Sequence, residues 1–95
     1  MPDIIWGTAT KIITTKTFEM NVTHQKEENN DTYTEVEIIE FTETDIMSIP
    51  DDENSRTIEQ IEHGLKDKFI KCEISNRNEE NQLVCKVSHS GAGGY

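Results

Sequence analysis

The chain has 95 residues, 33% of them hydrophobic and 29% charged, so we expect a single small domain with one modest core. Its formal net charge is −10, from 19 acidic and 9 basic residues, which argues against a surface built to bind phosphate backbones. The sequence has no apolar run of about 18 residues and no basic-then-apolar leader, so we expect neither a membrane span nor secretion. We therefore expect an intracellular protein, cytoplasmic or within a virus particle.

Alternating apolar residues predict two strands early in the chain, at 8–13 and 17–22, with a tight turn between them. In the second strand Phe18, Met20 and Val22 alternate with polar residues, which is typical of a half-buried strand. The polar stretch at 23–34 cannot bury a core face, and we expect it to be a loop or a long hairpin tip.

A third strand is predicted at 35–41. Val36 and Ile38 fall in one phase of the alternation, whereas Ile39 and Phe41 fall in the other. This change of phase predicts a bulge or a strong twist, as found where a sheet curls into a barrel.

One helix is predicted after this strand. Its apolar residues recur at helical spacing and form one stripe, made of Ile58, Ile61, Leu65 and Phe69. Asn54 or Ser55 is expected to cap its start.

Two further strands, at 70–75 and 83–87, flank a polar turn at 76–81 and predict a hairpin. Folding this hairpin about its middle places Cys72 opposite Cys85 and Ile70 opposite Val87, with Ile74 near Leu83 on the same core face. The fold class is therefore α+β and mostly β, with a five-stranded OB-fold barrel and one helix between strands three and four. We expect one domain at 1–87 and a flexible, Gly-rich tail at 88–95.

Cys72 and Cys85 allow three interpretations. They can be reduced core thiols, a cross-strand disulfide or two metal ligands. Reduced thiols fit the expected compartment, and no Cys-X-X-Cys spacing supports a metal site.

Several segments match the motifs of a known family. Lys11 to Phe18 is an apolar strand that closes on Thr17, and Asp45 follows a second apolar strand in a comparable setting. Together with the helix, the strand after it and the segment from Asn81 to Cys85, they resemble the thermonuclease-like (staphylococcal-nuclease-type) family over about residues 8–87.

The resemblance implies which residues stand at the family's Ca²⁺-dependent nuclease site. These positions are Thr14, Lys16, Glu40, Asp45, Ser48 and Gln82. Only Asp45 keeps the family's residue type. Lys16 puts a cation where a divalent metal must sit, and Glu40 puts an anion against the phosphate. We therefore expect an inactive pseudo-nuclease that binds no metal or cofactor, and Lys16 can form an ion pair with Glu40 or Asp45.

Arg56 is the only basic residue between Glu27 and Glu59, a stretch rich in carboxylates. This stretch is either a solvated surface or a patch that binds a basic protein. The binding candidates are Trp6, Glu35, Glu37, Glu43 and Tyr95. We favour a protein-interaction or structural module, as part of a multi-subunit assembly such as a virus particle. The alternatives are a non-cleaving nucleic-acid binder and an acidic mimic of nucleic acid.

Overall fold

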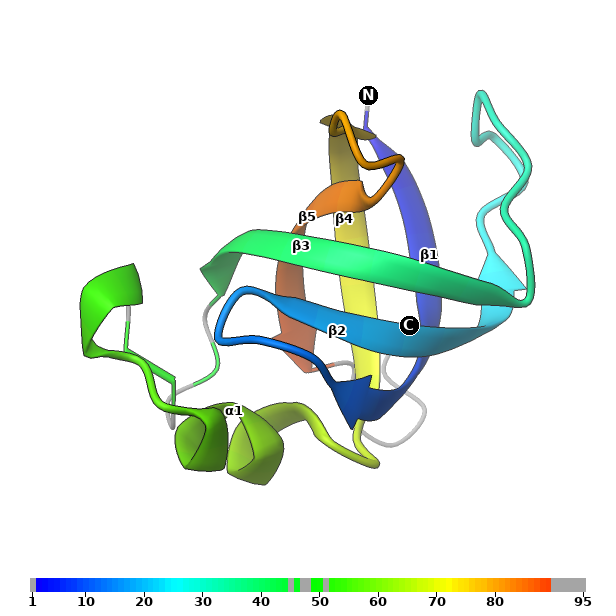
Figure 1. Cartoon of the computed structure of the whole chain (residues 1–95). Helices are drawn as coiled ribbons and strands as arrows, with labels where there is room; N and C mark the ends of the chain where they lie inside the picture. The colour runs from blue at the N-terminus through cyan, green and yellow to red at the C-terminus, as the bar shows by residue number, and fades with distance from the viewer. Residues whose placement is uncertain (1, 45, 47–48, 51, 90–95) are drawn as a thin grey trace.

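The computed structural model describes residues 2–44, 46, 49–50 and 52–89, and these form a closed β-barrel with one short α-helix (Figure 1). The strands are β1 (Asp3–Ile12), β2 (Thr17–Gln25), β3 (Val36–Thr44), β4 (Phe69–Arg77) and β5 (Leu83–His89). Their order around the barrel is β1-β2-β3-β5-β4, and β4 pairs with β1 to close it. β3 and β5 are parallel, whereas the other pairs are antiparallel. The prediction of a mostly β, five-stranded barrel is confirmed.

The strands at the two ends of the chain are longer than the sequence predicts. β1 begins at Asp3, because the run Ile4-Ile5-Trp6 continues the strand with Ile5 inside the barrel. β5 includes Ser88 and His89, where the sequence predicts the start of the flexible tail. His89 Nε2 lies 2.8 Å from the carbonyl oxygen of Gly64. Residues 90–95 lie outside the described residues.

The helix α1 (Ile58–Leu65) lies between β3 and β4 in the chain, as predicted, after a short 3-10 helix at Glu53–Ser55. Its cap is Thr57, not Asn54 or Ser55. The Thr57 hydroxyl accepts a hydrogen bond from the Gln60 N–H at 3.2 Å, and the Gln60 side chain accepts one from the Thr57 N–H at 2.9 Å. Among the described residues, no helix is long and apolar enough to cross a membrane.

The predicted apolar stripe of the helix is only half correct. Ile61 and Leu65 are fully buried, but Ile58 is 41% exposed. The helix ends at Leu65, because Lys66 is extended and Asp67 adopts a left-handed φ of 64°. The Asp67 N–H then donates to the Ala9 carbonyl at 2.8 Å, which ties this end of the helix to β1.

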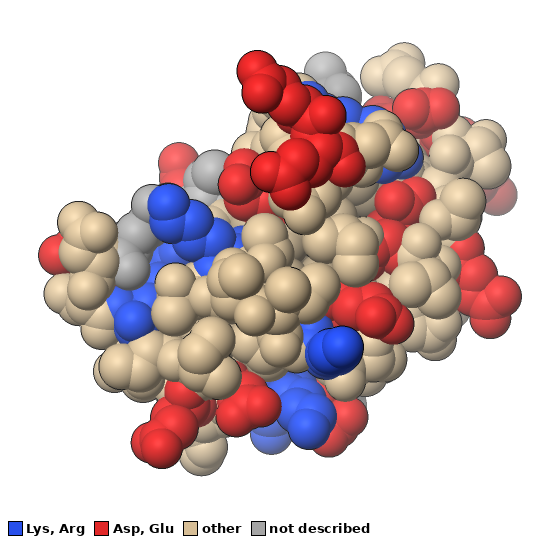
Figure 2. All heavy atoms as spheres, in the orientation of Figure 1, with Lys and Arg blue, Asp and Glu red and all other residues tan. Residues whose placement is uncertain are grey.

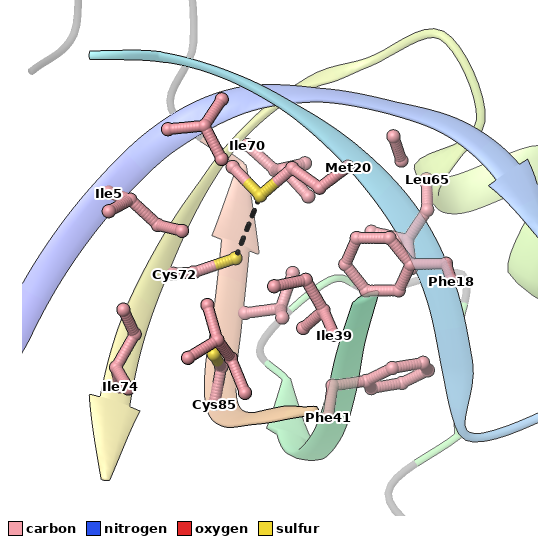
Figure 3. Packing of buried hydrophobic residues seen from close by; sticks show 14 of the residues in the cluster. Ile5, Phe18, Met20, Ile39, Phe41, Leu65, Ile70, Cys72, Ile74 and Cys85 are labelled. Carbon is pink, nitrogen blue, oxygen red and sulfur yellow. Dashed lines mark hydrogen bonds between the residues drawn. The ribbon is translucent and has the colours of Figure 1, made fainter. Parts of the chain in front are cut away.

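The core fills the inside of the barrel (Figure 3). Phe18 and Phe41 pack with ring centroids 5.8 Å apart. Cys72 and Cys85 are free thiols and fully buried, with Cys72 Sγ 3.6 Å from Met20 Sδ. Contact with Cys85 and burial raise the pKa of the Cys72 thiol well above its usual range, so it stays protonated.

The predicted face of the β4–β5 hairpin is confirmed, but its register was wrong by two residues. Cys72 lies opposite Val87 and Ile74 opposite Cys85. β4 continues to Arg77 and the turn is shorter than expected, with Asn81 at a φ of 65°. Because side chains alternate with a period of two, a shift of two residues keeps the same side chains inside.

The bulge predicted within residues 36–41 is absent. Glu37, Ile39 and Phe41 are buried in regular alternation, which puts Val36 and Ile38 on the outer surface of the barrel. The register shift in this strand comes later, between Phe41 and Glu43.

Gly7 marks the point where β1 bends around the barrel. The register of β1 against β2 shifts between Trp6 and Gly7. A Cβ atom added at Gly7 would overlap the backbone carbonyl of Asn21. Glycine is therefore required here by the close approach of the two strands.

Gly7→Ala is expected to lower the free energy of unfolding by about 2 kcal/mol, because the added methyl group must push β1 and β2 apart. Urea unfolding followed by circular dichroism measures this loss. The control is Thr8→Ala in the same strand, for which we expect a loss of about 0.5 kcal/mol. Equal losses in the two variants would contradict the close approach.

Candidate functional site

The first nuclease-like motif lies in the turn between β1 and β2. The Thr14 hydroxyl oxygen accepts hydrogen bonds from the backbone N–H groups of Lys16 and Thr17, each at 3.1 Å, and lies 2.7 Å from the Thr17 hydroxyl. These bonds shape the turn. The Thr14 side chain therefore stabilises the turn, at a position where the resemblance implies the first aspartate of the motif.

Lys16 and Glu40 are brought close together by this turn. The Phe41 N–H donates to the Lys16 carbonyl at 3.0 Å, and Glu40 lies opposite Thr17 in the β2–β3 register. The ion pair of Lys16 with Glu40 or Asp45 stays a prediction, and Asp45 and Ser48 lie outside the described residues.

Gln82 stands at the start of β5, next to the part of β3 that carries Ile39. Its side-chain oxygen accepts a hydrogen bond from the Asn78 amide at 2.9 Å, and its backbone carbonyl accepts one from the Asn78 N–H at the same distance. Gln82 therefore braces the β4–β5 turn.

The residues that the structure describes at these positions, Thr14, Lys16, Glu40 and Gln82, offer one carboxylate between them and do not by themselves fit a Ca²⁺ site. Calcium takes six to eight oxygen ligands, many of them carboxylates. The described part of the first motif offers an ammonium group and a hydroxyl that already accepts two hydrogen bonds. Among the residues that the structure describes, no three His, Cys, Asp or Glu side chains form a group that could hold a metal ion.

The other binding candidates are spread over the barrel. Trp6 is half-buried on the outside of β1, between His24 of β2 and Lys71 of β4 in the register. Glu35 is exposed just before β3, and Glu43 is exposed in β3 opposite Lys86. Tyr95 lies outside the described residues.

A cluster that the sequence did not reveal lies at the start of β1. Buried Asp3 accepts four hydrogen bonds from the connection between β2 and β3. The donors are Asn30 N (2.8 Å), Asn30 Nδ2 (3.2 Å), Asp31 N (3.1 Å) and Tyr33 Oη (2.6 Å). The bond from the Tyr33 hydroxyl is the main reason that the pKa of Asp3 lies below its usual value. Burial, followed by the Asp3 carboxylate, raises the pKa of Tyr33.

Glu37, a binding candidate from the sequence, is buried and holds the neighbouring part of this cluster together. It forms a salt bridge with Arg77 at 3.4 Å and accepts a hydrogen bond from the Thr34 N–H at 3.0 Å. Burial raises the pKa of Glu37, but the bonds from Thr34 and Arg77 lower it more, so the net shift is downward. The Arg77 guanidinium also lies over the Tyr33 ring, 5.8 Å from its centroid.

Two hollows flank Arg77. A pocket of about 300 Å³ lies on one side, with Asp3, Tyr33 and Asn76 among its lining residues. A more open hollow of about 430 Å³ lies on the other side, between β3 and the β4–β5 turn. We call the second one the outer groove; its lining includes Thr34, Val36, Ile38, Arg77, Glu80 and Gln82.

Exposed carboxylates surround this end of the barrel. They lie on the β2–β3 connection and the β4–β5 turn, and we call them the acidic rim: Glu27, Glu28, Asp31, Glu35, Glu79 and Glu80. Figure 2 shows red side chains gathered over the β4–β5 turn at the top and along the β2–β3 connection at the right. Lys26 and Arg77 are the only basic residues in 26–35 and 77–82, and Arg77 already pairs with Glu37.

No protein-family model, curated protein or solved structure matches the chain.

Asp3→Asn is expected to destabilise the chain at neutral pH, because an amide cannot accept the four hydrogen bonds that the carboxylate accepts. The pKa of Asp3 is lowered in the folded state, so its stabilising effect is present above the unfolded-state pKa of about 3.9 and is lost as the pH falls through the lower folded-state pKa. Thermal unfolding of both proteins from pH 7 down to pH 2 measures this difference. The Asp3→Asn deficit should shrink at the acid end; a deficit that is constant over the range would contradict the assignment. Glu62→Gln on α1 is the control.

Proposed function

We propose that this chain is a non-catalytic interaction module, built on an OB-fold barrel of the thermonuclease-like type, that binds a protein with a basic surface. The strand order β1-β2-β3-β5-β4, with α1 between β3 and β4, supports the OB-fold part of the proposal. We further propose that the module works inside the cell or within a virus particle, as one part of a larger assembly.

The proposal that the chain is not a nuclease rests on charge. Phosphodiester hydrolysis needs cations facing the developing negative charge, and removing one such contact typically costs about 10²–10³-fold in rate. Glu40 and Gln82 stand where the resemblance implies two arginines. Thr14 is bonded within its own turn, which also speaks against a part in metal binding.

The observation that carries the proposal is the acidic rim. Its carboxylates lie on two loops at one end of the barrel, so they form a field of one sign over a limited surface. Such a field attracts a basic protein surface and speeds its encounter, whereas it repels the phosphate backbone of nucleic acids.

The two alternative functions would use different surfaces of the barrel. A non-cleaving nucleic-acid binder would use the outer face of β1, where Trp6 lies between His24 and Lys71 and where the His24 and Phe69 rings meet edge to face. An acidic mimic would use the acidic rim against the nucleic-acid site of a partner.

The acidic rim is tested by a charge-matched pair of variants. Glu27→Gln, Glu28→Gln and Glu79→Gln together remove three carboxylates from the rim, and Glu59→Gln, Glu62→Gln and Glu73→Gln remove three from α1 and β4. Both variants have the same net charge, so only the position of the change differs. Affinity purification from an extract of the native source, with quantitative mass spectrometry, should show that the rim variant loses a basic partner and the control keeps it. Equal recovery by the two variants would refute the proposal.

Three further assays separate the alternatives. Single-stranded DNA and RNA binding at low salt, measured by filter binding, should be weak, and tight binding lost on Trp6→Ala would favour the nucleic-acid binder. Incubation with DNA and Ca²⁺ should leave the DNA intact. Cleavage by the pure protein would overturn the proposal that the chain is non-catalytic. If nucleic acid displaces the chain from its complex with the purified partner, the chain acts as an acidic mimic.

A further inference from the structure

The outer surface of β3 carries two apolar side chains that the core does not use. Val36 is 52% exposed and Ile38 is half-buried, and both point away from the barrel interior. Val36 is the most exposed of the large hydrophobic residues in the described part of the chain. β2 and β3 face the viewer in Figure 1, and in the matching view of Figure 2 the middle of this face is largely uncharged.

These two side chains form one wall of the outer groove. The β4–β5 turn supplies the other wall, with Glu80, Asn81 and Gln82, and the volume between the walls is about 430 Å³. Asn78 and Gln82 exchange hydrogen bonds across this turn: the Asn78 amide donates to Gln82 Oε1, and the Gln82 backbone N–H donates to Asn78 Oδ1. The second wall is therefore braced. The groove is therefore a fixed hollow with one apolar wall and one polar wall.

Carboxylates lie on both sides of the apolar pair. Glu80 is in the groove itself, and Glu19 of β2 stands directly opposite Ile38 on the same outer face. Arg77 also reaches the groove, but its guanidinium is bonded to Glu37 and to the Asn81 carbonyl at 3.0 Å. The groove therefore offers the Glu80 carboxylate to an incoming group, and Glu19 on the other side of the apolar pair also stands opposite Lys11 of β1.

We propose that the outer groove docks an extended segment of a partner protein in which basic and apolar residues alternate. In an extended chain, side chains on one face recur every roughly 7 Å, which is also the spacing of Val36 and Ile38 along β3. Apolar side chains on one face of the segment would cover Val36 and Ile38. The lysine or arginine side chains start on the opposite face and bend back along their long apolar stems to reach Glu80 on one side and Glu19 on the other. The inference rests on the proposed function, since it names the part of the basic partner that is recognised.

The test is direct binding of a fluorescein-labelled peptide of alternating lysine and leucine, measured by anisotropy. Val36→Lys is expected to weaken binding about tenfold, because it removes apolar contact and adds a like charge. The matched control is Ile58→Lys, which also replaces an exposed β-branched apolar residue by lysine. It lies on α1 at the far end of the barrel and should change the affinity less than about twofold. Equal effects of the two variants would overturn the proposal.

Two comparison peptides separate groove binding from general charge attraction. A lysine–serine peptide keeps the charge and lacks the apolar residues, so it should bind about tenfold more weakly than the lysine–leucine peptide. A glutamate–leucine peptide should not bind. If the lysine–serine peptide binds as well as the lysine–leucine peptide, the groove is not the recognition element.

A second variant and a mapping experiment keep the test independent of folding. Glu80→Lys changes an exposed turn residue, and it too should weaken the lysine–leucine peptide about tenfold. Amide resonances of Val36, Ile38 and Gln82 should shift on peptide addition, and shifts confined to another face would refute the proposal. If the rim variant loses its native partner while Val36→Lys keeps it, the proposed function stands and the groove inference fails.

Discussion

The Asp3 carboxylate is the contact on which this end of the molecule depends. A buried anion is costly unless hydrogen bonds replace its lost water, and here four donors from the β2–β3 connection do so. The same bonds fix a polar connection that has little apolar surface of its own. Tyr33 is thereby held in place, and Arg77 lies over its ring and pairs with Glu37 at the start of β3. One carboxylate thus positions the part of the acidic rim that lies on the β2–β3 connection and, through Tyr33 and Arg77, one end of the outer groove.

Closure of the barrel is the second constraint, and it explains where the polar chemistry lies. With β4 paired to β1, the described strands have no open sheet edge, and the interior holds only apolar and sulfur-containing side chains apart from the ends. Polar clusters must therefore form where strands begin and end. The turn that contains Thr14 and the cluster around Asp3 are both of this kind.

The sequence was sufficient wherever one face of a strand is buried and the other is solvated. Alternation located β2, β4 and β5 and their inward side chains, because burial on one face leaves a period of two. It failed in β1, where Ile4, Ile5 and Trp6 are all apolar and show no period. It also failed in β3, since both faces carry apolar residues and the pattern cannot say which face is inside. The change of phase in this strand arises because Val36 and Ile38 lie on the outer surface, and not from a bulge within residues 36–41.

The candidate site was predictable only in part. The resemblance brought Thr14, Lys16 and Glu40 to one place, and the β2–β3 register is consistent with that. The contact between Asp3 and Tyr33 joins residues 30 positions apart, and local patterns do not encode such pairs. The one available signal was Tyr33 itself, a lone aromatic residue in an otherwise polar stretch. Glu37 looked like a surface carboxylate because its partner, Arg77, lies 40 residues later, at the end of the next strand in the chain.

The reactivity of the two buried thiols reports local opening of the barrel. Cys72 and Cys85 have no exposed surface in the closed barrel, and a thiolate is the form that reacts with alkylating reagents. A reagent in solution can modify them only after β4 and β5 separate from their neighbours. The rate of alkylation therefore reports how often β4 and β5 open locally, which the reaction of an exposed group cannot report.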